Sequence, residues 1–171
     1  MLCHTWGDAE AVLFHHLVAA MGLYQLIYQS QALVPFETPD LDALLQQARA
    51  FNLEHNITGL LLYTPDGRFL QVLEGEQAVV HHLYYDRIVA DPRHFNCRVL
   101  ADGPCLKRSF SDWSMGFRVA NAQDLRKLLR NVPSDSPGVN VPRQHTRPEL
   151  LELLIEFVAN SEAEPWLEHP H

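Results

Sequence analysis

Alternating apolar and polar positions mark the first regular element of the chain at residues 23–30, LYQLIYQS. Every second side chain there falls on the same side, as the two faces of a β-strand require. Two further β-prone runs, ITGLLLY at 57–63 and RFLQVLE at 68–74, are separated by TPDG, a sequence typical of a tight turn. The pattern therefore predicts one strand, followed later in the chain by a β-hairpin.

Helical spacing separates these strands. A helix is expected from Thr38 to near Asn52, with Thr38 as its cap and Pro39 at its first position. Its apolar face consists of Leu41, Leu44, Leu45 and Ala48. A second helix is expected after Gly75, and Pro92 marks its end because proline cannot continue a helix.

Two more strands complete the predicted sheet, CRVLAD at 97–102 and SMGFRV at 114–119. The resulting order, β-α-β-β-α-β with a fifth strand added, is the split βαβ pattern of ferredoxin-like folds. We therefore expect an α+β fold in which two helices cover one face of the sheet.

The two ends of the chain are predicted to be appendages of this domain. Residues 1–22 form an N-terminal extension with a helical pattern over 8–21, and residues 120–171 form a C-terminal helical extension. This extension contains a short helix at 124–130 and a longer one at 146–160, separated by a linker rich in proline, serine and glycine.

The longer C-terminal helix is amphipathic. Thr146 and Glu149 have the spacing of a capping box at its start. Its apolar stripe consists of Leu150, Leu151, Leu154, Phe157 and Val158. A stripe of this kind is too apolar to stay in water, so the helix must be buried against another surface.

Composition is typical of a folded, soluble protein. Of its 171 residues, 47% are hydrophobic and 20% are charged. The formal net charge of -8 disfavours direct binding to nucleic acid, which requires a basic surface. No apolar run reaches the roughly 18 residues of a membrane span, and the N-terminal segment lacks the basic start of a signal peptide. We expect a cytoplasmic protein that does not bind membranes.

Motifs for catalysis and metal binding are missing from the sequence. Cys3, Cys97 and Cys105 lack CxxC spacing, so neither a disulfide framework nor a thiolate metal site is indicated. Two histidine pairs, at 15–16 and 81–82, are more typical of solvated helix faces than of a metal site. No GxGxxG, P-loop, HExxH or GxSxG motif occurs. These observations argue against an enzyme and against a metal centre.

Polar residues inside otherwise apolar strands are better candidates for functional residues than the cysteines and histidines. Gln71 interrupts FLQVL, where it either faces outward or is a buried amide that needs hydrogen-bond partners. Tyr28 poses a similar choice between a core tyrosine bonded to backbone and a functional phenol.

Three residues of the predicted helices could likewise have either a structural or a ligand-binding role. Asn52, taken alone, is a cap at a helix end. Arg87 and Asp91 are four residues apart, so they form a surface ion pair or present a cation and an acceptor to one ligand.

Five segments stand together in the order and spacing of the BLUF family, the sensors of blue light using FAD. They are LYQLIYQS, AFNLEHNITGLLLY, GRFLQVLEGE, YYDRIVADPRH and FSDWSMGF. On these motifs the chain resembles the family over about residues 22–119, and residues 23–119 are predicted to be a BLUF photosensor domain. The resemblance implies a flavin, FAD or alternatively FMN or riboflavin, inserted between the two helices against the sheet.

The resemblance also implies roles for individual residues. Tyr28 would donate an electron and a proton to the excited flavin, and Gln71 would link its hydroxyl to the flavin ring edge. Asn52 would bind the pyrimidine side of the ring, while Arg87 and Asp91 would contact the ribityl and phosphate region.

Residues on either side of the predicted site also compare with the family. Trp113 and Met115 match the family's mobile pair near the last strand. Many relatives carry a polar residue directly before the asparagine, where this chain has Phe51. One hydrogen bond to the flavin is therefore missing or replaced by packing.

These residues suit a sensor better than an enzyme, because a phenol and an amide beside a flavin consume no substrate. We expect a non-catalytic, homo-oligomeric protein that signals to a separate partner, with its C-terminal helix docked on the sheet face opposite the flavin or on a second subunit. The competing hypotheses are a flavin-using enzyme and a ferredoxin-like interaction module that binds no flavin.

Overall fold

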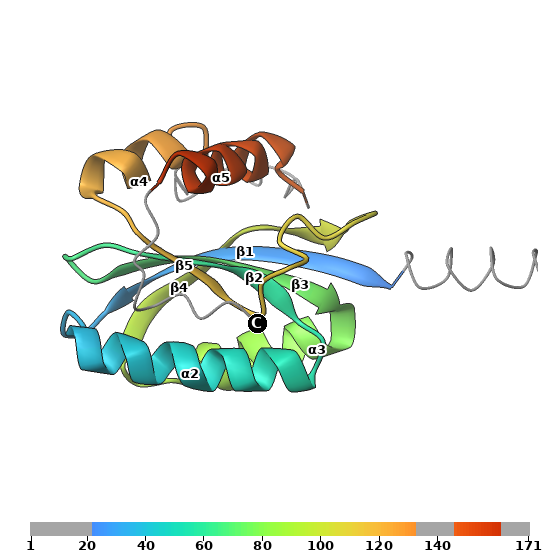
Figure 1. Cartoon of the computed structure of the whole chain (residues 1–171), viewed down its shortest axis with the longest axis horizontal. Coiled ribbons are helices and arrows are strands. Elements are labelled where there is room, and N and C mark those ends of the chain that lie inside the picture. Colours follow the sequence, from blue (N-terminus) through green and yellow to red (C-terminus); the bar gives the residue numbers. More distant parts are fainter. Residues whose placement is uncertain (1–21, 133–145, 162–171) are drawn as a thin grey trace, which may run out of the picture.

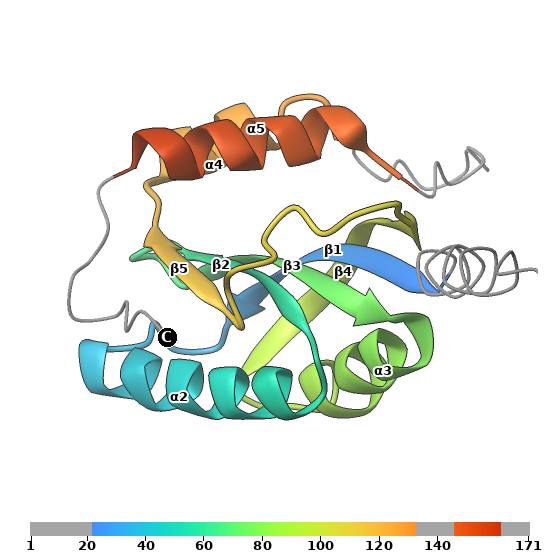
Figure 2. The ribbon, with the colours of Figure 1, turned by 45° about the vertical axis from the view of Figure 1, so that its right-hand side comes forward.

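A computed structural model describes residues 22–132 and 146–161 of the chain. Within these residues a five-stranded sheet, ordered β4-β1-β3-β2-β5, is covered by helices on both faces (Figures 1 and 2). The predicted helix over 8–21 lies outside the described residues. Every helix of the described part is too short or too polar to cross a membrane.

The strands confirm the predicted α+β, ferredoxin-like order. They are β1 Leu23–Ala32, β2 Thr58–Tyr63, β3 Arg68–Glu76, β4 His94–Pro104 and β5 Gly116–Val119. β1 pairs antiparallel with both β3 and β4, and β3 pairs antiparallel with β2. The added strand, β5, pairs parallel with β2 at the opposite edge from β4. The middle strand of the sheet is therefore β3, with β1 on one side and β2 on the other.

The turn between β2 and β3 follows the predicted turn chemistry. Gly67 has a φ of 87°, in the left-handed region that glycine adopts without steric cost. Its N–H donates to the Thr64 carbonyl at 2.8 Å, and its carbonyl accepts from Ala32 N at 2.7 Å. The turn thus closes the hairpin and is tied to the end of β1.

Two helical segments cover one face of the sheet. α2 Thr38–Glu54 begins one residue earlier than predicted, because its N-cap is Glu37 and the prediction of Thr38 is wrong. Asp40 is the third residue of the helix and completes a capping box with Glu37, since its carboxylate accepts from Glu37 N at 3.4 Å. The second segment begins as α3 Gln77–His81 and continues as a π-helix, η1 His82–Ile88, which ends before Pro92 as predicted.

The other face of the sheet carries α4 Ala122–Leu128 and α5 Pro148–Asn160 (Figure 1). Leu150 and Leu154 of α5 form a buried core with strand residues that point to this face of the sheet. Among these are Ile27, Leu60 and Val72. The prediction that this helix docks on the sheet, opposite the face covered by α2, is confirmed. We call this second core the distal core.

The predicted capping box of α5 is wrong. Its N-cap is Arg147 rather than Thr146, and no side chain caps it. Pro148 has the backbone angle of a first helical residue, which places the cap directly before it. The Arg147 side chain instead donates from Nε to the Leu100 carbonyl at 2.7 Å and so ties the start of α5 to β4.

Docking of α5 predicts a difference in stability between two neighbouring substitutions. Leu154 is completely buried, so Leu154→Ala should lower the free energy of unfolding by about 2–5 kcal/mol. Ile155 is 42% exposed, so Ile155→Ala should cost about 1 kcal/mol or less. Urea unfolding of both variants measures the difference, and equal losses would show that α5 does not pack on this sheet.

Candidate functional site

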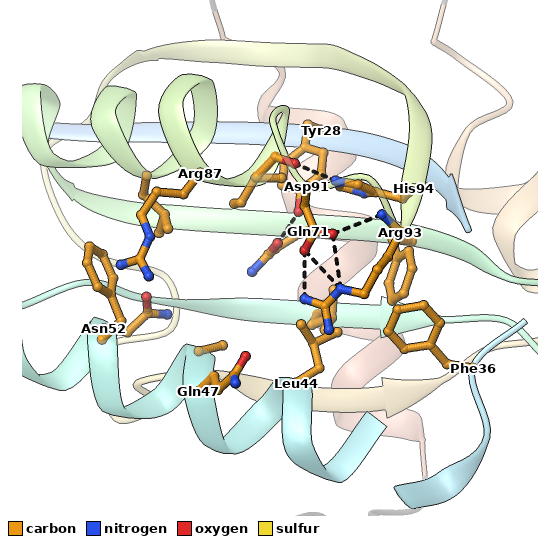
Figure 3. Close-up of a pocket in the computed structure, with 16 residues that line it drawn as sticks. Tyr28, Phe36, Leu44, Gln47, Asn52, Gln71, Arg87, Asp91, Arg93 and His94 are labelled. Carbon is orange, nitrogen blue, oxygen red and sulfur yellow. Dashed lines mark hydrogen bonds and ion pairs between the residues drawn. The ribbon is translucent and has the colours of Figure 1, made fainter. Parts of the chain in front are cut away.

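A cavity of about 210 Å³ lies on the α2 side of the sheet, between α2 and η1 (Figure 3). Its apolar lining consists of Phe36, Leu44, Ala48, Phe51, Leu61, Phe69, Leu83 and Ile88. Its polar lining consists of Tyr28, Gln47, Asn52, Gln71, Arg87, Asp91, Arg93 and His94. All five residues predicted to bind the cofactor therefore line one cavity.

Tyr28 and Gln71 meet on the floor of this cavity. They are opposite each other in the pairing of β1 with β3, so their side chains stand on the same face of the sheet. The Tyr28 hydroxyl donates to Gln71 Oε1, and Gln71 Nε2 donates to the Met115 sulfur at 3.5 Å. Gln71 is only 7% exposed. Of the two alternatives, the buried and hydrogen-bonded amide is confirmed.

The Tyr28 hydroxyl remains protonated in this setting. Burial raises the pKa of Tyr28 well above its ordinary value, and the neighbouring Cys97, Tyr84 and Asp91 add to the effect. A neutral phenol can donate to the amide oxygen, as the geometry requires. The Tyr28 hydroxyl therefore keeps its hydrogen and donates it in the hydrogen bond to Gln71 Oε1.

Tyr84 is a second buried phenol that sequence reasoning missed. Its ring lies 4.9 Å from that of Tyr28, centroid to centroid, and it is 2% exposed. Burial also raises the pKa of Tyr84. Tyr84 lies within the π-helix, where Val89 N donates to its carbonyl at 2.9 Å. This wider helical turn could not be read from the apolar periodicity.

Asn52 is not the cap of α2 that its position near the predicted helix end suggested, because it lies inside the helix and the C-cap is His55. Its side chain is 1% exposed, and its Nδ2 donates to the Ser114 carbonyl at 2.6 Å. The bond links α2 to the segment that leads into β5. Asn52 thus stands at the cavity wall with its amide fixed by a second part of the chain.

Arg87 and Asp91 do not pair with each other in the described part of the chain. Asp91 binds Arg93, with 2.6 Å between Arg93 Nη2 and Asp91 Oδ2, and this guanidinium lowers the pKa of the Asp91 carboxyl. The Arg87 guanidinium instead lies 4.3 Å from the centre of the Phe51 ring. Arg93 was not predicted as a site residue, although the DPR sequence places it two residues after Asp91.

Phe51, where relatives were expected to carry a polar residue, serves as an aromatic platform. One face of its ring is stacked on His55, with centroids 3.9 Å apart and planes 17° apart. The Arg87 guanidinium also lies over this ring, so α2 and η1 are joined beside the cavity. Packing and a cation–π contact thus replace a hydrogen-bonding side chain here.

Trp113 and Met115 lie on opposite faces of the sheet. Met115 is 2% exposed and belongs to the core that contains Tyr28. Trp113 packs against the distal core, where its ring is stacked on Phe110 at 6.1 Å and lies 5.3 Å from the Arg118 guanidinium. The structure therefore brings Met115, and not Trp113, to Gln71.

The chemistry of the cavity fits a flavin. The isoalloxazine ring is flat and apolar on its faces, with nitrogen and carbonyl groups along one edge. Figure 3 shows Tyr28 and Gln71 on the sheet, Asn52 and Arg87 towards one end, and Asp91 and Arg93 towards the other. Apolar walls, three amides (Gln47, Asn52 and Gln71) and the guanidinium groups of Arg87 and Arg93 fit a flavin with a phosphate-bearing side chain.

Comparison with known families identifies the class of protein that this fold and cavity define. The chain matches the model of the BLUF family, described as sensors of blue-light using FAD, over residues 23–116. The match covers more than half of the chain, so this chain belongs to the BLUF family. The predicted family, cofactor and sensor class are thereby confirmed, and the flavin of the family is FAD.

The relatives include both short and long proteins. The chain is 39% identical over 98 residues to photoactivated adenylate cyclase subunit beta of Euglena gracilis, covering 56% of this chain and 11% of that protein. Among solved structures, BlsA in its photo-activated state has a TM-score of 0.62 at 30% identity and covers 82% of this chain and 97% of that one. The dark-state structure of BlrB has a TM-score of 0.59 at 30% identity, with the same coverage.

A third solved structure bears on the cofactor. Klebsiella pneumoniae BlrP1 with FMN and cyclic diGMP has a TM-score of 0.54 at 32% identity, covering 81% of this chain and 35% of that one. FMN is thus present in a solved structure that resembles this chain. The chain spans about a tenth of the length of the curated cyclase subunits it matches, so their activity belongs to those proteins.

The Asp91–Arg93 pair predicts a pH-dependent contribution to stability. Arg93 lowers the Asp91 pKa below its ordinary value of 3.8, so the pair stabilises the fold above that pH and loses its effect as the pH falls through the folded pKa. Because both side chains are partly exposed, Asp91→Asn should cost about 1 kcal/mol or less near pH 7 and less still near pH 3. Urea unfolding at both pH values measures this.

Asp86→Asn is the control, because the Asp86 side chain contacts His82 Nδ1 at 2.9 Å but is 66% exposed, and a pair so exposed contributes little. Its effect should stay small at both pH values. An equal cost of Asp91→Asn at both pH values would show that the ion pair is not the source of the effect.

Proposed function

We propose that this chain is a blue-light receptor in which the hydrogen bond between Tyr28 and Gln71 is the light-responsive element. The observation that carries the proposal is the buried contact of the Tyr28 hydroxyl with Gln71 Oε1 on the floor of the cavity. Membership of a family of flavin-using light sensors supports it.

Different residues of the cavity would contact different parts of the cofactor. Asn52 and Arg87, towards the same end of the cavity, would bind the polar edge of the ring (Figure 3). Asp91 and Arg93 would contact the ribityl and phosphate groups. Arg87, predicted from the sequence to share that task, stands over Phe51 and beside Asn52, which favours the ring edge for it. FMN and riboflavin would use the same ring contacts as FAD.

When bound, the flavin supplies the absorption of blue light and an acceptor for an electron. Tyr28 would give an electron to the flavin, and its hydroxyl hydrogen would move to Gln71 Oε1, with which it is already in contact, while a hydrogen of the Gln71 amide group would move on to the flavin. An electron and a proton then return to Tyr28, so no substrate is consumed. The Gln71 amide then settles with different hydrogen-bond partners, either by rotation or by a change of tautomer.

A change at one buried amide is large enough to act on its surroundings. Leaving a buried hydrogen-bonding group mismatched costs about 1–3 kcal/mol, which suffices to shift a two-state element. Gln71 Nε2 contacts the Met115 sulfur, and Met115 directly precedes β5. The strand β5 and the helices of the distal face are therefore the proposed route out of the site.

We propose that the output is binding to a separate signalling protein rather than catalysis. The part of the chain that the structure describes consists of the BLUF domain with α4 and α5 packed on its sheet. Its cavity offers a phenol, amides and an ion pair, which is the chemistry of cofactor binding. Homo-oligomerisation stays a prediction.

Tyr28→Phe should keep the flavin and abolish the normal photocycle, because it preserves the ring and removes the hydroxyl. Wild-type protein is expected to be yellow, and blue light should shift its absorption reversibly to longer wavelength. Tyr84→Phe is the matched control and should retain the shift, since Tyr84 is a neighbouring buried phenol outside the Tyr28–Gln71 bond. Absorption spectra before and after illumination check all three proteins.

The same spectra separate the competing functions. A colourless protein that takes up no FAD would support an interaction module without flavin. A full reversible shift in Tyr28→Phe would remove Tyr28 from the mechanism. Turnover of an added reductant under illumination would point instead to a flavin-using enzyme.

Gln71→Leu should bind flavin but lose the light-induced shift. Leucine is similar in size but cannot change a hydrogen bond, while Asn52, Arg87 and apolar packing still hold the ring. The cost in stability should be about 1 kcal/mol if the Tyr28 hydroxyl finds another acceptor. Difference spectra under identical illumination measure the shift.

Gln47→Leu is the control, because Gln47 lines the same cavity without contacting Tyr28 in the described structure. It should keep the shift. An undiminished shift in Gln71→Leu would mean that the amide is not the switch.

A further inference from the structure

Three consecutive carbonyls, at positions 113–115, are each held by a donor from a neighbouring element. The Trp113 carbonyl accepts from Gly59 N at 3.1 Å. The Ser114 carbonyl accepts from Asn52 Nδ2 at 2.6 Å, and the Met115 carbonyl accepts from Arg49 Nε at 3.0 Å. Two of these donors lie three residues apart on α2, so the helix that walls the cavity also fixes this segment.

This segment is where the chain crosses from one face of the sheet to the other. Trp113 packs in the distal core, whereas the Met115 sulfur accepts from Gln71 Nε2. The Trp113 ring is so close to Gly116 that a Cβ there would stand 2.2 Å from it. The side chains on either side of Ser114 cannot exchange faces without breaking the carbonyl bonds that hold them.

We infer that Arg49 is a positioning residue of the light-responsive site, which keeps the Met115 sulfur against the Gln71 amide by holding the Met115 carbonyl. A hydrogen bond from a guanidinium is stronger than one between neutral groups. Arg49 is partly buried, and desolvation lowers its pKa without removing its charge at neutral pH. Asn52, which binds the adjacent carbonyl, already belongs to the cofactor site.

The positioning role can be tested in the dark, on flavin-loaded protein, with ¹³C-labelled methionine methyl groups. The chain has three methionines, so the Met115 signal is assigned with a Met115→Leu reference. In the wild type it should show one position. In Arg49→Leu a second position should appear, with the ratio of the two arrangements changed about tenfold.

The chemistry of the side chain provides a rescue. Glutamine carries an N–H at the same distance along the side chain as arginine Nε, but no charge, so Arg49→Gln should restore most of the wild-type signal. Arg49→Lys keeps the charge and lacks a donor at that point, so it should resemble Arg49→Leu. If Arg49→Leu does not fold, Arg49→Lys can be measured in its place.

Two controls separate positioning from loss of stability. Arg126 makes the same type of bond, from Nε to the Ala122 carbonyl at 3.1 Å, on the exposed surface of α4, so Arg126→Leu should leave the Met115 signal unchanged. Leu154→Ala destabilises the fold from the distal face, and it measures how much the Met115 signal changes through loss of stability alone. A Met115 signal in Arg49→Leu that differs no more than in Leu154→Ala would overturn the inference.

The relevance of Arg49 to light sensing rests on the proposed function, but this measurement does not need a photocycle. If the wild type shows no reversible spectral shift, the proposed function fails while the dark-state signal still tests Arg49. If the shift is present and the Met115 signal is unaffected by Arg49→Leu, only the positioning role fails.

Discussion

The hydrogen bond between Tyr28 and Gln71 is the interaction around which the candidate site is organised. A buried amide must find partners, and here its oxygen accepts from the phenol while its nitrogen donates to the Met115 sulfur. Both residues lie in the central strands β1 and β3, whose antiparallel register places them side by side. The sheet order thus puts this polar contact at the floor of a cavity that both apolar and polar side chains line.

The two faces of the sheet differ in what they contain, and residues 113–115 run from one face to the other. One face, with α2 and η1, forms the cavity. The other face buries the distal core under α4 and α5. Gln71 contacts Met115, and Trp113, two residues earlier in the chain, packs in the distal core. A movement of Gln71 can therefore reach the distal helices through only three residues of the chain. This arrangement suits a sensor whose ligand stays bound while its surroundings rearrange.

The sequence predicted much of the fold, because the strands have clear alternation and the turns have characteristic residues. Period-two patterns and the TPDG turn located the strands, and the apolar stripe of α5 predicted its docking. The exact helix starts were missed, since Glu37 and Arg147 become caps through local backbone geometry that residue preference does not reveal.

The candidate site was predicted less completely than the fold. The resemblance to a family located the residues that line the cavity, whereas Gln71 alone left inward and outward placement open. The Asp91–Arg93 pair and the Arg87–Phe51 contact depend on side-chain positions across a helix end and between two helices. The helical period cannot show such contacts, and the π-helical turn that carries Tyr84 shifts that period further.

Infrared difference spectroscopy on protein labelled with ¹³C at the glutamine side-chain carbonyl tests the central claim most directly. The account predicts an isotope-sensitive amide carbonyl band that changes on blue illumination, reverts in the dark and is absent from Gln71→Leu. A light-induced spectrum without any isotope-sensitive glutamine band, or one whose band persists in Gln71→Leu, would contradict it.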